Sequence, residues 1–121
     1  MQGKDAITAK KIIKYCDDIE RYICGMREED FSEDDKTISA CAFCLGQIGE
    51  LTKHISNETQ QQYSDIPWRK MYGLRNRIVH NYEGVDMSQM WAIVKEDIPK
   101  VKVDLSNILM QNAVLFRPSK Q

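Results

Sequence analysis

Four stretches of the chain repeat apolar residues at steps of three and four, which is the spacing of an amphipathic helix. None alternates apolar and polar residues with the period of two that a half-buried β-strand requires. The pattern therefore predicts an all-α protein, a four- to five-helix up-and-down bundle formed by a single domain over residues 1–116, followed by a frayed tail at residues 117–121. The four helical stretches are residues 5–25, Ser32 to Ile55, Asp65 to His80 or Tyr82, and residues 86–88 to 114–115.

Residues that begin or interrupt helices refine this prediction. Ser32 precedes three acids in what would be a first helical turn, so it is predicted to cap the second helix. Gly46 and Gly49 lie inside that helix and predict close approach by a neighbouring helix, which would offset the roughly 1 kcal/mol that each glycine costs relative to Ala. Pro99 lacks a backbone N–H, so we expect a kink or a restart in the fourth helix, with Asp97 as a candidate cap.

Composition restricts the class of protein and its compartment. The chain has 121 residues, of which 42% are hydrophobic and 29% are charged, as in ordinary folded proteins. The sequence contains neither the roughly 20-residue apolar run of a membrane span nor the apolar N-terminal stretch of a secretory signal. We therefore expect a cytoplasmic protein that does not bind membranes.

Cys41 and Cys44 form a C-x-x-C pair, the spacing of many zinc and redox sites. No turn residue and no histidine accompany them, and the surrounding segment is apolar and helical. Packing in the core is the favoured interpretation, because a free cysteine behaves as a small buried hydrophobe. We accordingly expect no bound metal and no cofactor.

Charge is distributed unevenly, although the net charge is only −1. Residues 28–35 hold six acids, whereas residues 67–80 hold four Arg or Lys residues and no acid. Trp68 and Tyr72 lie among these bases, a combination typical of RNA-contacting surfaces. A solvated helix face would give the same run of bases, so both interpretations stay open. The candidate RNA contacts are Arg69, Lys70 and Arg77.

The basic segment brings a cation, an imidazole and a phenol within eight residues, at Arg75, His80 and Tyr82. A histidine near neutral pKa can take a proton from a ribose 2′-hydroxyl or give one to the leaving oxygen, and an arginine can hold the phosphate. At about 100° per residue, Arg75 and Tyr82 fall within roughly 20° of each other on a helix, whereas His80 lies about 140° from Arg75. The helix must therefore loosen near His80, or a second copy must supply the missing partner. A purely structural Arg75–His80 pair is the alternative, because this spacing alone is a weak pattern.

The segment resembles the HepT-like branch of the HEPN superfamily, whose signature is Arg-x4-His-x-Tyr. Arg75, His80 and Tyr82 match this signature residue by residue. Further positions along the chain also resemble the family, and together with the signature they are far more specific than the Arg-to-His spacing alone. Those positions follow in the same order over nearly the whole chain, at Asp30-Phe31, residues 47–50, Ile66-Pro67-Trp68, Gly84-Val85-Asp86 and Trp91.

The resemblance implies a HEPN-like bundle that forms a homodimer, with the two motifs meeting in a cleft near the two-fold axis. It implies a metal-independent ribonuclease toxin that acts on RNA and not on DNA, with Arg75 and His80 catalytic and Asn76 in support. The implied partner is a nucleotidyltransferase antitoxin of the MntA type, which neutralises the toxin by transferring AMP to Tyr82. A non-catalytic helical module that supports such a nucleotidyltransferase is the alternative. An RNA-cleavage assay of the wild type and His80→Ala would separate the two.

Overall fold

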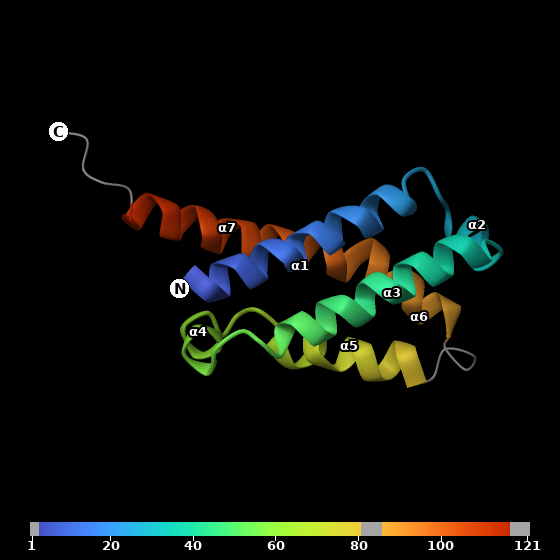
Figure 1. Cartoon of the computed structure of the whole chain (residues 1–121). Coiled ribbons are helices and arrows are strands. Elements are labelled where there is room, and N and C mark those ends of the chain that lie inside the picture. Colours follow the sequence, from blue (N-terminus) through green and yellow to red (C-terminus); the bar gives the residue numbers. More distant parts are fainter. Residues whose placement is uncertain (1–2, 81–85, 117–121) are drawn as a thin grey trace.

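Four long helices form an up-and-down bundle (Figure 1). The computed structural model describes the backbone of residues 3–80 and 86–116 and the side chains of residues 3–74 and 86–111, and within these ranges it contains no strand. Each long helix runs antiparallel to the one before it, so the predicted all-α up-and-down bundle is confirmed. The tail predicted at residues 117–121 lies outside the described residues. The long helices are α1 (Gly3–Tyr22), α3 (Asp35–Thr52), α5 (Trp68–His80) and α7 (Ile98–Phe116).

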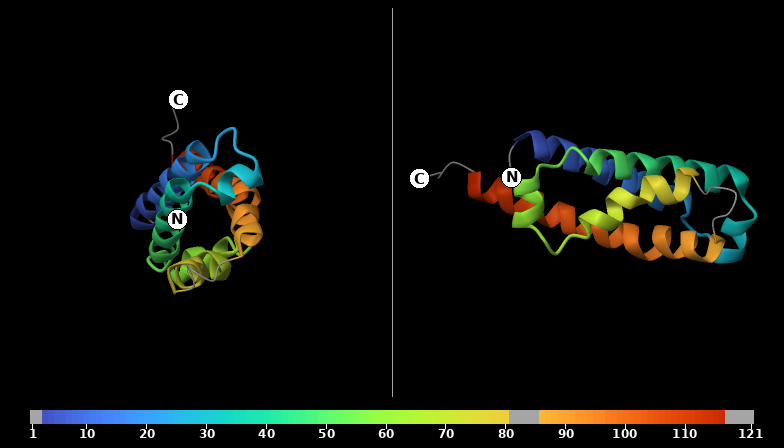
Figure 2. Two further views of the ribbon diagram at one scale, coloured as in Figure 1. Left: turned by 90° about the vertical axis from the view of Figure 1, so that its right-hand side faces the viewer. Right: turned by 90° about the horizontal axis from the view of Figure 1, so that it is seen from below.

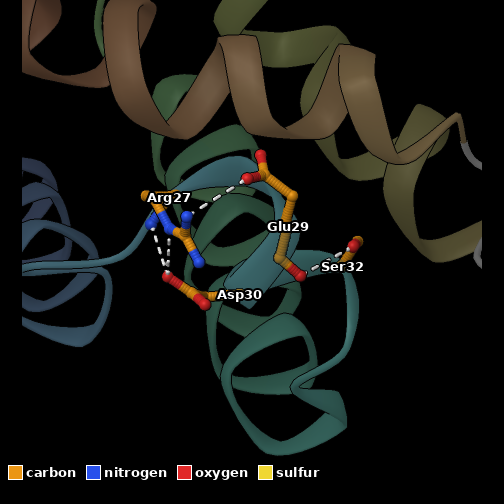
Figure 3. A network of polar contacts seen from close by, with 4 residues as sticks. All are labelled: Arg27, Glu29, Asp30 and Ser32. Atoms are coloured by element: carbon orange, nitrogen blue, oxygen red, sulfur yellow. Dashed lines mark hydrogen bonds and ion pairs between the residues drawn. The ribbon is translucent and has the colours of Figure 1, made fainter.

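Two short helices that the apolar pattern does not predict connect the long ones. α2 (Glu28–Ser32) lies between α1 and α3, and α4 (Asn57–Gln62) lies between α3 and α5. The backbone N–H of Arg27 donates to the Asp30 carboxylate over 2.9 Å at the start of α2 (Figure 3). These helices span too few residues to show an apolar repeat, and a local hydrogen bond from a backbone N–H to a side chain begins each of them.

The prediction that Ser32 caps the second long helix is wrong. Ser32 ends α2, where its hydroxyl donates to the Glu29 carbonyl over 3.0 Å (Figure 3). Asp34 caps α3 instead, because its carboxylate accepts hydrogen bonds from the backbone N–H (3.1 Å) and the hydroxyl (2.8 Å) of Thr37. These bonds lower the pKa of Asp34, and an ionised carboxylate at a helix N-terminus is further favoured by the helix dipole.

The last predicted helix is one continuous helical path with a local change of pitch. α6 (Met87–Ala92) passes into a π-helical turn (Ile93–Asp97) and then directly into α7. Ile98 has helical dihedral angles (φ −64°, ψ −46°), so the chain does not restart and Asp97 does not act as a cap. The wider turn comes just before Pro99. Proline has no backbone N–H to donate to the carbonyl four residues earlier, and its ring would clash with that carbonyl in a regular α-helix.

The core lies between the facing stripes of the four long helices. Gly46 and Gly49 are buried on α3, which makes its most extensive contact with α5, in keeping with a close approach of these two helices. The largest fully buried side chains are those of Phe31, Ile12, Ile19, Leu45, Ile48, Met71, Met90, Ile98 and Leu105.

All four cysteines are free thiols, and three of them are buried while Cys24 is exposed. Cys41 and Cys44 lie on the buried face of α3, which confirms the packing interpretation of the C-x-x-C pair. Burial raises the pKa of Cys16 and Cys41 to about 12 and that of Cys44 to about 11. These three thiols therefore stay protonated and poorly nucleophilic at neutral pH.

The two ends of the bundle carry different parts of the chain. The start of α1, the end of α7 and α4 lie at one end, whereas α2, α6 and the last turn of α5 lie at the other (Figure 1). Seen from below, α5 runs between α3 and α7 (Figure 2). No helix in the described part of the chain is both long enough and apolar enough to cross a membrane.

Candidate functional site

The candidate residues from the sequence lie along α5, and the first turn of this helix is fixed by Trp68. The Trp68 side chain is buried, and its indole N–H donates to the carbonyl of Tyr63 over 3.0 Å. The backbone N–H of Met71 donates to the carbonyl of Pro67 over 3.0 Å, so the proline directly precedes the helix as its fixed φ angle favours. Met71 and Leu74 continue the buried face towards the second half of α5.

Arg69 and Lys70 are exposed on the first turn of α5, on opposite flanks of the buried stripe. The last two turns of the helical backbone contain the other four candidates on this segment, which are Arg75, Asn76, Arg77 and His80. Tyr82 lies outside the described residues. The structure thus brings six of the seven candidates onto one helix.

The geometry of α5 decides which of these residues share a face. The helix is α-helical through His80, so its backbone does not loosen between Arg75 and His80. At about 100° per residue, these two positions are about 140° apart around the helix axis. Arg69, Asn76 and His80 instead fall within about 40° of one another, on a face that runs the length of α5.

The chain resumes at α6, which is held in place by α2. Asp86 caps α6 by accepting the backbone N–H of Ser88 over 2.9 Å. The Ser88 hydroxyl donates to the Glu28 carboxylate over 2.8 Å. The buried ring of Phe31 contacts the ring of Trp91, with centroids 5.3 Å apart. These contacts fix the point at which the chain returns after the motif.

Sequence reasoning missed the positioning role of Glu28, Phe31 and Ser88. The similarity of Asp30-Phe31 and Trp91 to positions of a known family was the signal that these two regions matter, but periodicity gave no reason to bring them together. They meet because α2 and α6 lie at the same end of the bundle (Figure 1). The sequence pattern also does not predict a role for Lys53, which follows α3 directly and lies beside the first turns of α5.

Three hollows flank the start of α5. The first, which we call the Tyr72 groove, has a volume of about 350 Å³ and is lined by Thr52, Lys53, Gln60, Trp68, Arg69 and Tyr72. The second, of about 170 Å³, lies between α5 and the π-helical turn and α7, and its charged lining is mixed, from Asp65, Lys70, Asp97 and Lys100. The third, of about 490 Å³, is lined by polar side chains of α4 and the following loop together with Trp68 and Arg69, and it also has no acid in its lining. Of these three hollows, the Tyr72 groove is the one that combines two cations, Lys53 and Arg69, with an exposed aromatic ring.

The donor set along α5 suits proton transfer and phosphate binding. An imidazole can exchange a proton near neutral pH, and guanidinium groups can bind phosphate oxygens in pairs. Among the residues with described side chains, no group of three or more His, Cys, Asp or Glu is arranged to hold a metal ion.

Comparison with known proteins identifies a family that the sequence matches over a range that includes this segment. The sequence model of the family described as Ribonuclease HepT-like matches residues 12–108, a range that includes Arg75, Asn76, His80 and Tyr82. A Thermococcus cleftensis protein named probable ribonuclease HepT is 41% identical over 90 residues, which cover 74% of this chain and 79% of that protein. A Methanocaldococcus jannaschii protein named as an RNase is 32% identical over 94 residues, which cover 78% of this chain and 86% of that protein. No solved structure matches the chain.

Proposed function

This chain belongs to the ribonuclease HepT-like family of the HEPN superfamily, as an endoribonuclease of that type, and we propose that it cleaves RNA phosphodiesters without a metal ion, using Arg75 and His80. The observation that carries this proposal is the Arg75-x4-His80-x-Tyr82 signature, which lies inside the matched range. RNA in the cytoplasm is the substrate. DNA is not, because the reaction needs a ribose 2′-hydroxyl.

The proposed chemistry divides between the cation and the imidazole. Arg75 binds the scissile phosphate and offsets the negative charge that develops on it. His80 takes the proton from the 2′-hydroxyl, whose oxygen attacks phosphorus while the bond to the 5′-oxygen breaks. The leaving 5′-oxygen needs a proton from the opposite side of the phosphate. A second histidine supplies it best, since one imidazole cannot easily reach both sides of an in-line displacement.

A homodimer would supply that second histidine. α5 is an unbroken helix through His80, so Arg75 and His80 of one subunit lie about 140° apart around its axis. These two side chains therefore cannot easily contact the same phosphate, and a second subunit would supply the missing group. Isologous packing of two α5 helices near a two-fold axis would bring His80 and the partner's His80 into one cleft. Asn76, on the His80 face of α5, would support the site. Arg69, Lys70 and Arg77 would contact the RNA backbone.

Regulation follows from the tyrosine of the signature. We propose that the protein is the toxin of a toxin–antitoxin pair, and that an MntA-type nucleotidyltransferase inactivates it by transferring AMP to Tyr82. The added phosphate would carry a negative charge beside Arg75 and His80 and compete with the RNA backbone for the same cation.

A cleavage assay tests this function directly. Purified protein in EDTA is expected to cut single-stranded RNA and to leave 5′-hydroxyl ends. His80→Ala is expected to lower the rate by about 10²- to 10⁴-fold, the usual contribution of a general acid–base group. His54→Ala is the matched control, because His54 is the other histidine of the chain and is exposed beyond the end of α3. A wild type that does not cut RNA, or a His80→Ala variant that cuts it normally, would contradict the proposal and favour a non-catalytic binding module.

A further inference from the structure

The Tyr72 groove has the features of a nucleotide-binding surface. Tyr72 is one of the few large aromatic side chains left exposed, at 46% of its surface, and the Lys53 ammonium lies 5.9 Å from the centre of its ring. Arg69 lines the same groove and has no acidic partner among the described residues. The buried Trp68 also lines the groove and holds α5 to the preceding loop.

This combination suits single-stranded RNA better than it suits a protein segment. An exposed ring can stack on the face of any base, and nearby cations bind the phosphates on either side. Lys53 already pairs with Glu50 over 3.1 Å, so a phosphate would compete with that carboxylate for the ammonium. This ion pair is more than one-third exposed on both sides and is therefore weak enough to be exchanged.

The groove and the proposed cleavage site lie on the same helix, α5. Arg69, Asn76 and His80 share one face of α5, and Tyr72 lies about 60° from Arg69 towards α3. At about 1.5 Å per residue, Tyr72 and His80 are about 12 Å apart along the helix axis. A stacked strand advances about 3.4 Å per nucleotide, so this distance corresponds to about three to four nucleotides.

We propose that the Tyr72 groove is a subsite for single-stranded RNA, in which a base about three to four nucleotides from the scissile phosphate stacks on Tyr72 and the adjoining phosphates bind Lys53 and Arg69. The inference rests on the proposed function, because it assigns a second contact to the same substrate. It gives the protein a preference for RNA long enough to span both the motif and the groove.

The test measures RNA binding in a background that does not cut. Each variant is made in His80→Ala protein, and fluorescence anisotropy gives the affinity for labelled single strands of about 2 and about 12 nucleotides. The shorter strand cannot reach from the cleavage site to Tyr72, whereas the longer strand can. Tyr72→Ala is expected to weaken binding of the longer strand about tenfold and to reduce its advantage over the shorter one. Tyr72→Phe, which keeps the ring, is expected to restore that advantage. Lys53→Gln is expected to lower the slope of log affinity against log salt by about 0.7, the effect of one lost phosphate contact.

The chain offers a matched control for the aromatic–cation pair. Tyr22 is 37% exposed and has the Arg21 guanidinium 5.6 Å from its ring, but it lies on α1, away from α5. Tyr22→Ala is therefore expected to bind the longer strand like the parent. Equal binding by Tyr72→Ala and the parent would overturn the subsite while leaving His80-dependent cleavage, and with it the proposed function, intact. A change in oligomeric state on Tyr72→Ala, measured by light scattering, would overturn it in favour of an interface between copies.

Discussion

The ring of Phe31 on α2 contacts that of Trp91 on α6, with the two planes inclined by 45°. These residues are far apart in sequence, and their contact ties the loop between α1 and α3 to the point where the chain re-enters the bundle after the motif. The stability of the fold and the position of the proposed active site therefore depend on the same pair.

Phe31→Ala should lower the free energy of unfolding by about 3–5 kcal/mol, because Phe31 is fully buried and its removal leaves a cavity beside Trp91. Phe43→Ala provides the matched control. The Phe43 ring is 62% exposed and contacts the Tyr15 ring edge-on, with centroids 6.2 Å apart, so its loss should cost about 1 kcal/mol, well below the cost of Phe31→Ala. Urea denaturation followed by circular dichroism measures both. Similar values for the two variants would mean that Phe31 is not a core anchor.

A second prediction concerns Asp5, which is buried at the start of α1 and joins it to α4. Its carboxylate accepts hydrogen bonds from the backbone N–H (3.1 Å) and hydroxyl (2.6 Å) of Ser56 and from the hydroxyl of Thr59. Burial raises the pKa of Asp5, but these hydrogen bonds outweigh it and hold the pKa below its usual value of 3.8. Because the pKa is lower in the folded state, the ionised carboxylate stabilises the fold above about pH 4, and this contribution is lost as the pH falls through the folded-state pKa.

Asp5→Asn should therefore lower the free energy of unfolding at pH 7 by about 1–3 kcal/mol, with a smaller difference from wild type below about pH 4. Urea denaturation over a pH series measures the effect. Asp65→Asn, at an exposed position, controls for the loss of one negative charge. A difference for Asp5→Asn that is the same at pH 3 and pH 7 would rule out ionisation as its cause.

A third prediction tests whether two subunits share one cleavage site. If cleavage needs both His80 and the partner's His80, a dimer with one His80→Ala subunit is inactive. Random pairing of equal amounts of wild type and His80→Ala, by refolding them together, should then leave about one quarter of the activity of wild type alone at the same total concentration. Independent subunits would leave about one half. The same mixture made with His54→Ala should keep full activity.

A fourth prediction concerns the proposed modification. Tyr82→Phe should keep nuclease activity, because the phenol takes no part in the proton transfers, and it should resist inactivation by an MntA-type enzyme with ATP. Wild type treated in the same way should gain AMP on Tyr82 and lose activity, which intact-mass and peptide mass spectrometry would show. AMP on another residue, or inhibition without AMP, would move the regulatory site away from Tyr82.

The sequence predicts the long helices well because each carries an apolar stripe, but it does not predict where the chain turns. Three of the four residues from Ser32 to Asp35, namely Ser32, Asp34 and Asp35, are good capping residues, and a local rule cannot choose among them. The choice falls on Asp34 once Phe31 is buried against Trp91 and places Ser32 in the last turn of α2. α4 likewise depends on a tertiary contact, the hydrogen bonds from Ser56 and Thr59 to Asp5.

The sequence predicts the motif residues of the candidate site but not the groove beside them. Arg75 and His80 stand out because the motif is contiguous in sequence, and the structure continues α5 through both. The Tyr72 groove was not predictable, because Lys53 comes from the end of α3 and reaches Tyr72 only through the packing of α3 against α5. Similarly, Pro99 indicates an irregularity, but its form as a π-helical turn depends on how α6 and α7 are joined.

Because one cysteine is exposed and three are buried, the protein can be labelled at a single site for distance measurements without any substitution. Cys16, Cys41 and Cys44 are buried and protonated, so a thiol-specific reagent should react first at Cys24, in the turn that follows α1. That turn leads into α2 at the end of the bundle where the motif-bearing helix finishes (Figure 1). A spin label or fluorophore placed there without any substitution would be carried once per subunit. The distance between two such labels would then report how two chains are arranged in solution, with and without RNA.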